Sequence, residues 1–264
     1  QEAHTPWEWH EPLMKKAKQL GLICFSSPFD ETAVEFLEKI NCPAYKIASP
    51  EIIHLPLIEK VVSTGKPIII STGMASLEEL DEVINYIVNN GASDFAILKC
   101  TSNYPASPSD SNLITIPNLR KIYDCEIGFS DHTLGLGASL AAIGLGATII
   151  EKHFTLNRLD GGVDSSFSLN PTEMEQLVNE SENAWLSVGN IQFGPSKSEI
   201  ETIKQRRSIY IAKNIKKGEI ITGKHLKIIR PGFGIKPKYY KTIKGMTIKR
   251  DVEKGTAFSW EFLK

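Results

Sequence analysis

The chain has 264 residues, 41% of them hydrophobic and 23% charged, with a formal net charge of −1 at pH 7. This is the composition of an ordinary globular protein, and nothing in the overall charge balance would attract a polyanion. We therefore expect neither a nucleic-acid partner nor a membrane partner, because no apolar run approaches the roughly 20 residues of a membrane-spanning helix. Four widely spaced cysteines without a C-x-x-C pair predict reduced, structural thiols and a cytoplasmic location.

Short apolar runs alternate with longer amphipathic stretches from residue 22 to about residue 156. A helix is expected over residues 5–21, before the first run. Two more helices are predicted by "DETAVEFLEKI", which opens with a capping Asp, and by "SLEELDEVINYIVNNG", which has a Ser-x-x-Glu capping box and a Gly stop. The predicted strands are residues 22–27, 44–49, 67–72, 95–101, 126–132 and 147–154. Their spacing of roughly 20 to 30 residues, and runs that are apolar throughout, are typical of parallel strands covered by helices.

Polar or ionisable residues stand at the C-terminal end of every predicted strand. An open sheet binds ligands mainly at one switch point, whereas a barrel gathers all of its strand ends around one mouth. The pattern therefore favours a TIM-type (β/α)₈ barrel, and we expect its first two βα units to be missing from this chain. The strand-end residues are Ser26, Ser27, Lys46, Ser49, Glu51, Ser71, Thr72, Lys99, Thr101, Ser102, Ser130, Asp131, His132, Glu151, Lys152 and His153.

The character of the sequence changes after the barrel region, which we expect to cover residues 1–190. A polar linker is predicted over residues 191–207. Residues 208–264 contain short β-like pieces broken by Gly, Pro and Lys turns, which predict a small, mostly β domain near the lower size limit for folding alone. Its dense lysines and arginines would be either a solvated surface or a specific charge contact with a substrate or a neighbouring subunit.

Two histidines, His132 and His153, end consecutive predicted strands, and a carboxylate precedes each of them (Asp131 and Glu151). Such a histidine can be a metal ligand, a general base or a hydrogen-bonded core residue. Imidazole with oxygen ligands would suit Mn²⁺, Zn²⁺, Co²⁺ or Fe²⁺, with substrate or water completing the shell. Spacing alone leaves the metal pair and the packed strand ends equally open.

Hydroxyl groups and one ammonium group gather at the neighbouring strand ends, on Ser27, Lys46, Ser49 and Ser71. There is no P-loop and no dinucleotide-binding glycine motif, but this set would bind a small phosphate or carboxylate. Two alternatives stay open: the serines end strands through their turn propensity, or Lys46 is a Schiff-base lysine. Asp164 lies in a Gly-, Asp- and Ser-rich loop after the last strand, where it would hold sugar hydroxyls or stabilise a turn.

Several motifs resemble, in the same order, those of sialic acid synthases. They are "FSSPFD", "YKIASPEI", "PIIISTGMAS", "KCTSNYP", "GFSDHTLG" and "GATIIEKHFTL". The segment "NIKKGEIITGKHLKIIRPGFG" resembles the C-terminal antifreeze-like (SAF) domain of these enzymes, a small β-clip fold. Within the family, "AHTPWEWH", "LDGGVDSSFSL" and "RPGFGIKPKYY" are most similar to pseudaminic acid synthases.

The resemblance implies a condensation of phosphoenolpyruvate with a 6-deoxy-2,4-diacetamido hexose, giving pseudaminic acid and phosphate. Synthases of N-acetylneuraminate, legionaminate or a spore-coat polysaccharide are the alternatives within the family. The reaction is expected to depend on a divalent metal (Mn²⁺, Mg²⁺ or Co²⁺). Because the family's first two barrel units have no counterpart here, the piece as given is expected to be inactive or much impaired without them.

The resemblance also implies roles for individual residues. His132 and His153 would be the metal ligands, and Glu51 would exchange a proton with the sugar. Ser102 stands where neuraminate synthases carry Asn, and Arg230 would reach the N-acetyl group of the sugar from the SAF domain of a partner in a swapped homodimer. The residues around phosphoenolpyruvate would be Lys46, Ser27, Ser49, Ser71 and Ser130, and those facing the sugar would be Glu51, Tyr104 and Asp164.

Two readings from other classes remain. A Schiff-base aldolase would use Lys46 as its nucleophile, and borohydride trapping of a pyruvoyl adduct would support it. A non-enzymatic ice- or glycan-binding module would rest on residues 208–264 alone, and the polar cluster at the strand ends argues against it.

Overall fold

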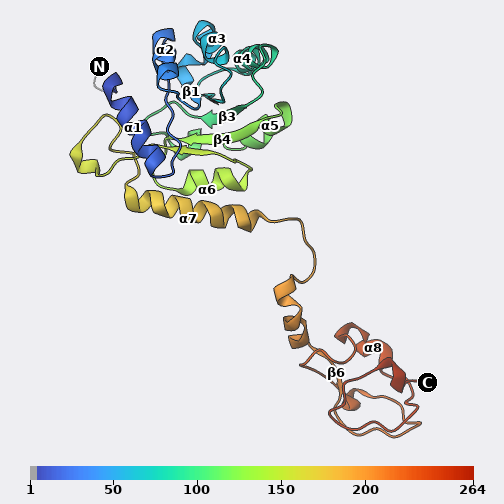
Figure 1. Ribbon diagram of the computed structural model, residues 1–264. Helices are drawn as coiled ribbons and strands as arrows, with labels where there is room; N and C mark the ends of the chain where they lie inside the picture. Colours follow the sequence, from blue (N-terminus) through green and yellow to red (C-terminus); the bar gives the residue numbers. More distant parts are fainter. Residues whose placement is uncertain (1–4) are drawn as a thin grey trace. The chain divides into compact units, whose positions relative to one another are not determined.

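The computed structural model describes residues 5–264 of the chain (Figure 1). The chain forms two compact units, one up to Gly189 and one from Asn190 to Lys264. Each unit has a hydrophobic core of its own.

The first unit is built on five parallel strands that lie side by side in chain order and alternate with helices. This arrangement confirms the predicted barrel-type α/β fold, of which the sheet forms one curled part (Figure 1). The strands are β1 (Tyr45–Ile47), β2 (Ile68–Ser71), β3 (Phe95–Cys100), β4 (Glu126–Asp131) and β5 (Ile150–Lys152). The α-helices are α1 (Trp7–Gln19), α2 (Glu31–Lys39), α3 (Leu55–Val62), α4 (Leu77–Asn89), α5 (Thr115–Ile122), α6 (Gly137–Gly144) and α7 (Pro171–Val188). Short 3₁₀ turns are η1 (Ser49–Ile53), η2 (Pro108–Asp110) and η3 (Arg158–Asp160).

The two faces of the sheet have different chemistry because successive side chains of a strand point to opposite sides. One face is apolar and packs into the core beneath the helices; it carries Tyr45, Ile47, Ile68, Ile70, Ile97, Ile127 and Phe129. The strand register places the alternate residues side by side on the other, concave face, where Cys100 pairs with Ser130 and Ser130 pairs with Glu151. Polar groups therefore collect on the concave face near the carboxyl ends of the strands.

The predicted helix starts are confirmed in their atomic details. The Asp30 carboxylate accepts a hydrogen bond from the Ala33 amide at 2.8 Å, which caps α2. Ser76 and Glu79 form the predicted capping box of α4, with reciprocal bonds of 3.2 and 2.8 Å. In the described residues, no helix combines the length and the apolarity that crossing a membrane requires.

The prediction of a strand over residues 22–27 is wrong. Only Ser26 makes a β-bridge, to Tyr45, and its carbonyl accepts the Lys46 amide at 3.1 Å. Leu22 and Ile23 are 62% and 79% exposed. Within residues 5–264 no strand pairs with the other edge of this segment, so its apolar side chains have no second neighbour to pack against.

The second unit confirms the small, mostly β architecture predicted for the end of the chain. Strands β6 (Ser208–Ile211) and β7 (Leu226–Ile229) pair antiparallel, and single bridges such as Ile215–Val252 extend the pairing. Its core combines Ile209, Ile211 and Leu226 with Phe258 and other apolar residues. The remaining elements are η4 (Lys197–Glu199), η5 (Glu201–Gln205), η6 (Gly223–His225), η7 (Pro237–Tyr239), α8 (Tyr240–Ile243) and η8 (Trp260–Phe262).

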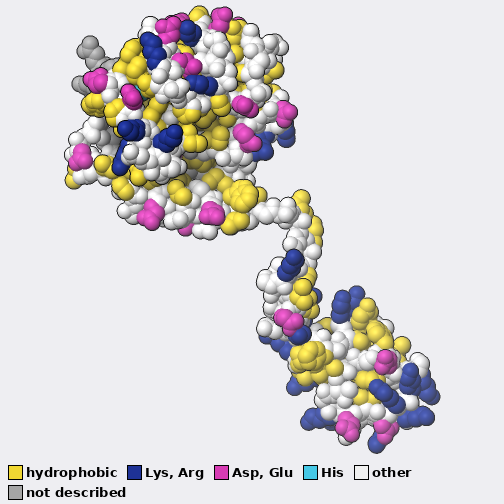
Figure 2. Space-filling view, in the orientation of Figure 1, with side chains coloured by type: hydrophobic (Ala, Val, Ile, Leu, Met, Phe, Trp, Pro, Cys, Tyr) yellow, Lys and Arg dark blue, Asp and Glu magenta, His cyan; other side chains and the backbone are white. Residues whose placement is uncertain are grey.

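The two units carry large charges of opposite sign. The second unit has 18 Lys and Arg residues against 6 Asp and Glu, a formal net charge of +12. The first unit has 12 against 25, a net charge of −13. Figure 2 shows lysine and arginine side chains distributed over the second unit. The near-zero net charge of the whole chain therefore conceals two strongly charged halves.

Gly128 is the position where the sheet tolerates no side chain. A Cβ atom there would lie 2.5 Å from the Ile149 carbonyl oxygen and 2.5 Å from Leu98 Cδ2. Because this overpacks β4 against its neighbours, we expect Gly128→Ala to lower the free energy of unfolding by about 1–3 kcal/mol. Gly144→Ala in α6 is the matched control, since a Cβ there meets nothing within 4 Å. Urea unfolding followed by tryptophan fluorescence measures both, and equal stability of the two variants would contradict the prediction.

Candidate active site

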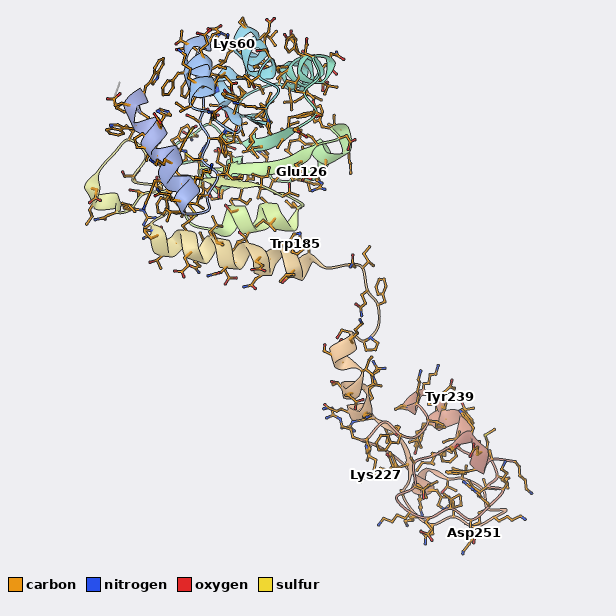
Figure 3. All side chains as sticks on the ribbon, in the orientation of Figure 1. Lys60, Glu126, Trp185, Lys227, Tyr239 and Asp251 are labelled. Carbon is orange, nitrogen blue, oxygen red and sulfur yellow. The ribbon has the colours of Figure 1, made fainter. Side chains whose placement is uncertain are left out.

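The residues predicted to form the site in the first unit lie on the strands near their carboxyl ends or in the segments that follow, except Ser27, which lies next to the single β-bridge of Ser26. Figure 3 labels Glu126, which marks the opposite, amino end of β4. Arg230 belongs to the second unit, where it follows β7. The first-unit residues are Ser27, Lys46, Ser49, Glu51, Ser71, Ser102, Tyr104, Ser130, His132, His153 and Asp164.

An ion pair joins the first and the last strand of the sheet across its concave face. The Lys46 Nζ on β1 lies 2.8 Å from the Glu151 Oε2 on β5. The Ser130 hydroxyl donates to Glu151 Oε1 at 2.6 Å, and the Ser27 hydroxyl donates to the Lys46 carbonyl at 2.7 Å. Four predicted or neighbouring site residues are thus held in one hydrogen-bonded network.

The ionised form of Glu151 is favoured because Lys46 and Ser130 both contact its carboxylate. Burial alone would raise the pKa of Glu151, but the Lys46 ammonium and the Ser130 hydroxyl outweigh it and lower the pKa below its usual value. Lys46 is therefore the cationic partner of an ionised carboxylate. A Schiff-base mechanism needs a neutral amine, so this ion pair argues against the aldolase reading.

The two strand-end histidines face each other, with their ring centroids 5.1 Å apart. The Tyr104 ring packs against both, at 4.3 Å from His132 and 5.9 Å from His153. His132 Nδ1 lies 2.8 Å from the Thr101 carbonyl, and His153 Nδ1 lies 3.3 Å from Asp164 Oδ2. Since both partners can only accept, each Nδ1 carries the proton and each Nε2 keeps its lone pair.

The surroundings push the pKa values of the two imidazoles apart. Burial, together with the charge that His132 can carry, lowers the pKa of His153 despite the nearby Asp164 carboxylate. Burial would also lower the pKa of His132, but hydrogen bonds with Cys100 and the Thr101 carbonyl outweigh it and raise the pKa. Protonation of His132 therefore disfavours protonation of His153.

The donor set fits a divalent metal ion as two of its ligands. Histidines that bind metals typically donate their other ring N–H to a carbonyl or a carboxylate, as both do here. Within residues 5–264 no group of three or more His, Cys, Asp and Glu side chains could hold a metal on its own. Substrate or water oxygens would have to complete such a shell.

Three buried polar atoms in the site have no hydrogen-bond partner. They are Glu51 Oε2 and the hydroxyl oxygens of Ser71 and Ser102. Buried polar groups are nearly always paired, so unpaired ones in a group of strand ends indicate the place of a polar ligand. Burial also raises the pKa of Glu51 above its usual value. A buried carboxyl group whose pKa is raised is a candidate for proton transfer.

Gly73 and Cys100 belong to the site but were not predicted. Gly73 has a φ of +50°, and a Cβ there would lie 2.7 Å from the Ser102 hydroxyl and collide with Ser49. Its lack of a side chain lets Ser49 and Ser102 approach each other. Cys100 is buried, and its Sγ lies 3.3 Å from the Ser49 hydroxyl and 3.9 Å from His132 Nδ1. A glycine directly after a strand, in "STGMAS", was the available signal for Gly73; a lone cysteine offered none.

Asp131 and Lys152 precede the two histidines but point to the opposite face. Lys152 Nζ lies 2.9 Å from Asp131 Oδ2, and both side chains are at most 2% exposed. The Asp131 carboxylate also accepts the Ser139 hydroxyl at 2.6 Å and the Thr133 amide at 2.8 Å. This buried pair ties the ends of β4 and β5 together directly beside His132 and His153.

The fold places the first unit in the α/β-barrel class, in which active sites lie at the carboxyl ends of the strands. Residues 1–193 match the NeuB family, and residues 206–264 match the SAF domain. The chain therefore belongs to the NeuB family and is an enzyme, a nonulosonic acid synthase, which confirms the resemblance seen in the sequence.

Relatives of known name support this assignment. The chain is 40% identical over 263 residues to the pseudaminic acid synthase of Helicobacter pylori, covering 98% of this chain and 76% of that protein. It is 38% identical over 239 residues to an N,N'-diacetyllegionaminic acid synthase of Campylobacter jejuni, covering 89% and 72%. Among solved structures, the spore coat polysaccharide biosynthesis protein spsE of Bacillus subtilis matches with a TM-score of 0.68 and 32% identity, covering 99% and 78%.

The buried pair beside the histidines predicts a large effect of breaking it. Lys152→Met leaves the Asp131 carboxylate buried without its counter-ion, so we expect a loss of about 3–5 kcal/mol of unfolding free energy. In the double variant Lys152→Met with Asp131→Asn no charge is left unpaired, and most of the loss should be recovered. Urea unfolding measures both variants, and a double variant as unstable as the single one would contradict this explanation.

Proposed function

We propose that the enzyme condenses phosphoenolpyruvate with a 6-deoxy-2,4-diacetamido hexose to give pseudaminic acid and phosphate. The observation that carries the proposal is the set of unpartnered buried groups on Glu51, Ser71 and Ser102, beside the cationic Lys46. Together they offer hydroxyl groups, one positive charge and one carboxyl group of raised pKa at the carboxyl ends of the strands and in the turns that follow. A phosphorylated acid beside a neutral sugar requires this combination.

Lys46 and the serines of the strand ends bind the anionic substrate in this proposal. The ammonium group of Lys46 neutralises part of its charge, and its pairing with Glu151 keeps the side chain at the concave face. Ser49, Ser71 and Ser130 supply hydroxyl groups from the ends of β1, β2 and β4. Those of Ser49 and Ser130 already donate to Cys100 and Glu151, so Ser71 offers the free donor among them within the described residues. Ser27 stabilises this arrangement through the Lys46 carbonyl.

The reaction forms a bond between C3 of phosphoenolpyruvate and the aldehyde carbon of the open-chain sugar. A water molecule adds to C2, the C2–O bond breaks, and phosphate leaves with that bonding pair. Glu51 is the group that delivers a proton to the sugar oxygen, because burial raises its pKa and so favours its protonated form. Tyr104 and Asp164 lie beside the two histidines and face the sugar in this proposal.

A divalent ion (Mn²⁺, Mg²⁺ or Co²⁺) bound by the Nε2 atoms of His132 and His153 would supply Lewis-acid polarisation of the aldehyde oxygen. Thr101 and Asp164 support this role by fixing the tautomer of each imidazole. Tyr104 packs on both rings and limits their rotation.

Phosphate release tests the reaction and the sugar together. Tested in a full-length protein with a complete barrel, phosphate is expected to be released from phosphoenolpyruvate only when an aminosugar is present, and faster with 6-deoxy-2,4-diacetamido-altrose than with N-acetylmannosamine. His132→Gln and His153→Gln should each lower kcat/KM by about 100-fold, since each removes a metal ligand. His225→Gln in the second unit is the matched control and should leave the rate unchanged.

Other outcomes would assign the enzyme differently. A higher rate with N-acetylmannosamine would favour an N-acetylneuraminate synthase, and a higher rate with a legionaminate precursor would favour that branch. Undiminished turnover of both histidine variants, with intact metal dependence, would contradict the ligand assignment. Trapping of a Lys46 adduct by borohydride would restore the aldolase reading.

We further propose a domain-swapped homodimer, in which Arg230 reaches the sugar of the partner's barrel. The opposite net charges of the two units, −13 and +12, support an association between a barrel unit and a SAF unit. Arg230 is a suitable contact because a guanidinium group donates hydrogen bonds to a carbonyl oxygen, such as that of an acetamido group.

Mixing two inactive variants tests the swap. Arg230→Ala removes the proposed sugar contact of the SAF unit, and His153→Gln removes a proposed metal ligand of the barrel unit. A mixed dimer then holds one intact composite site, so a re-equilibrated equimolar mixture should recover about a quarter of the wild-type activity. A mixture of His132→Gln with His153→Gln is the control and should recover none, because both barrels are defective. Failure of the first mixture, with mixed dimers shown to form, would exclude the swapped site.

A further inference from the structure

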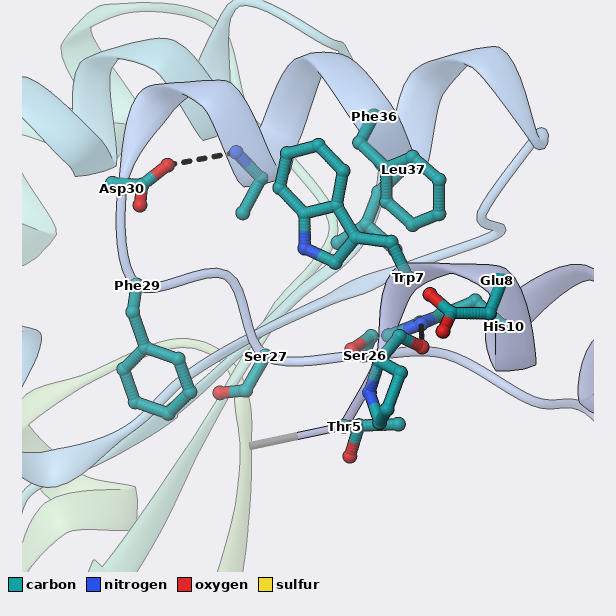
Figure 4. Close-up of a pocket in the computed structure, with 12 residues that line it drawn as sticks. Thr5, Trp7, Glu8, His10, Ser26, Ser27, Phe29, Asp30, Phe36 and Leu37 are labelled. Carbon is teal, nitrogen blue, oxygen red and sulfur yellow. Dashed lines mark hydrogen bonds between the residues drawn. The ribbon is translucent and has the colours of Figure 1, made fainter. Parts of the chain in front are cut away.

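A second pocket, of about 830 Å³, opens beside the strand-end site between α1 and the start of α2 (Figure 4). We call it the rim pocket. Its lining includes three aromatic side chains and several polar ones, and it lies in the size range of small-molecule sites. The residues used below are Trp7, Glu8, Ser27, Phe29, Asp30 and Phe36.

The aromatic wall of the rim pocket is fixed in place. Trp7 stacks on Phe36 with ring centroids 4.6 Å apart and an angle of 13° between the planes. His10 meets Phe36 edge-on at 5.4 Å, and its Nδ1 bonds the Pro6 carbonyl at 3.2 Å. The outer faces remain accessible: Trp7 is 42% exposed and Phe29 is 62% exposed. Ordered, accessible aromatic rings around one concave space are suited to bind an apolar group.

The charges around the rim pocket favour a neutral ligand over an anion. Its charged lining residues in the described chain are the carboxylates Glu8 and Asp30, and none is Lys or Arg. Asp30 is ionised, since the Thr32 hydroxyl and the Ala33 amide hydrogen-bond to it and lower its pKa. An anionic substrate would be repelled here and attracted to Lys46 instead.

The rim pocket and the strand-end site have Ser27 in common. This residue lines the rim pocket, and its hydroxyl donates to the carbonyl of Lys46 at 2.7 Å. Figure 4 shows the Ser27 hydroxyl between the Trp7–Phe36 stack and Phe29. Two substrates that are to be joined must occupy adjacent spaces, and this is the space next to the cationic one.

We propose that the rim pocket binds the apolar substituents of the neutral aminosugar, the methyl groups of its acetamido and 6-deoxy positions, against Trp7 and Phe29. This inference rests on the proposed function and adds a specificity site to it. The carboxylate of Glu8 accepts hydrogen bonds from amide N–H or hydroxyl groups of the same sugar. Phosphoenolpyruvate remains at Lys46.

Two variants and two matched controls test the rim pocket. Phe29→Ala removes an exposed ring without a core contact, and Trp7→Leu removes the stacked wall. Phe193→Ala and Trp185→Leu remove more exposed aromatic rings of the same two types elsewhere, 96% and 66% exposed; Trp185 is labelled on α7 in Figure 3. We expect each rim variant to raise KM for the diacetamido sugar by about tenfold, with KM for phosphoenolpyruvate unchanged, because each loses one apolar contact. The preference over N-acetylmannosamine should shrink by the same factor.

Calorimetric titration with the diacetamido sugar alone separates this inference from the proposed function. If the wild type binds the sugar but releases no phosphate once phosphoenolpyruvate is added to a full-length protein, the reaction is wrong, yet weaker binding by Phe29→Ala still supports the pocket. If turnover is intact and both rim variants bind as the controls do, the pocket is wrong and the function stands. A wild type that does not bind the sugar, or rim variants that change only KM for phosphoenolpyruvate, would overturn the inference.

Discussion

The ion pair between Lys46 and Glu151 is the constraint on which the active site depends. These residues lie on the first and the last strand of a five-stranded sheet, and their charged atoms are 2.8 Å apart. In a flat sheet the two strands would be about 19 Å apart at the usual spacing of neighbouring strands, beyond the reach of the two side chains. The sheet must therefore curl, and the curl brings Ser130 and the unpartnered hydroxyls of the intervening strand ends around one space.

Successive side chains of a strand point to opposite faces, so the residues proposed to bind substrate and the residues that stabilise the strand ends lie on different faces of the sheet. Lys46, Ser130 and Glu151 point to the concave face, whereas Asp131 and Lys152 point away from it and form a fully buried ion pair. Each supporting residue directly precedes a histidine of the site. The residues that support the two imidazoles therefore lie on the face of the sheet opposite the site. On the concave face, Ser130 and Lys46 bond Glu151.

Much of this arrangement could be predicted, because strand ends and helix caps are encoded locally. Parallel strands bring their carboxyl ends to one edge of the sheet, so the polar residues that follow each apolar run are expected to lie close together. Pairings across long distances were not predictable: nothing near Lys46 indicates Glu151, 105 residues further on. The strand expected at residues 22–27 failed because a strand needs a neighbour, which no local pattern supplies. Gly73 escaped prediction because its importance lies in the close approach of Ser49 and Ser102.

The net charge of the whole chain does not describe how charge is distributed between its two units. A net charge of −1 suggested that no polyanion would be attracted, but the average combines units of −13 and +12. The same segregation recurs on a smaller scale within the first unit. Lys46 provides positive charge at the strand ends, whereas Glu8 and Asp30 line the adjoining rim pocket with aromatic rings. An enzyme that joins an anion to a neutral sugar needs two adjacent spaces of different charge, since a single cationic pocket would accept two molecules of the anion as readily as one of each.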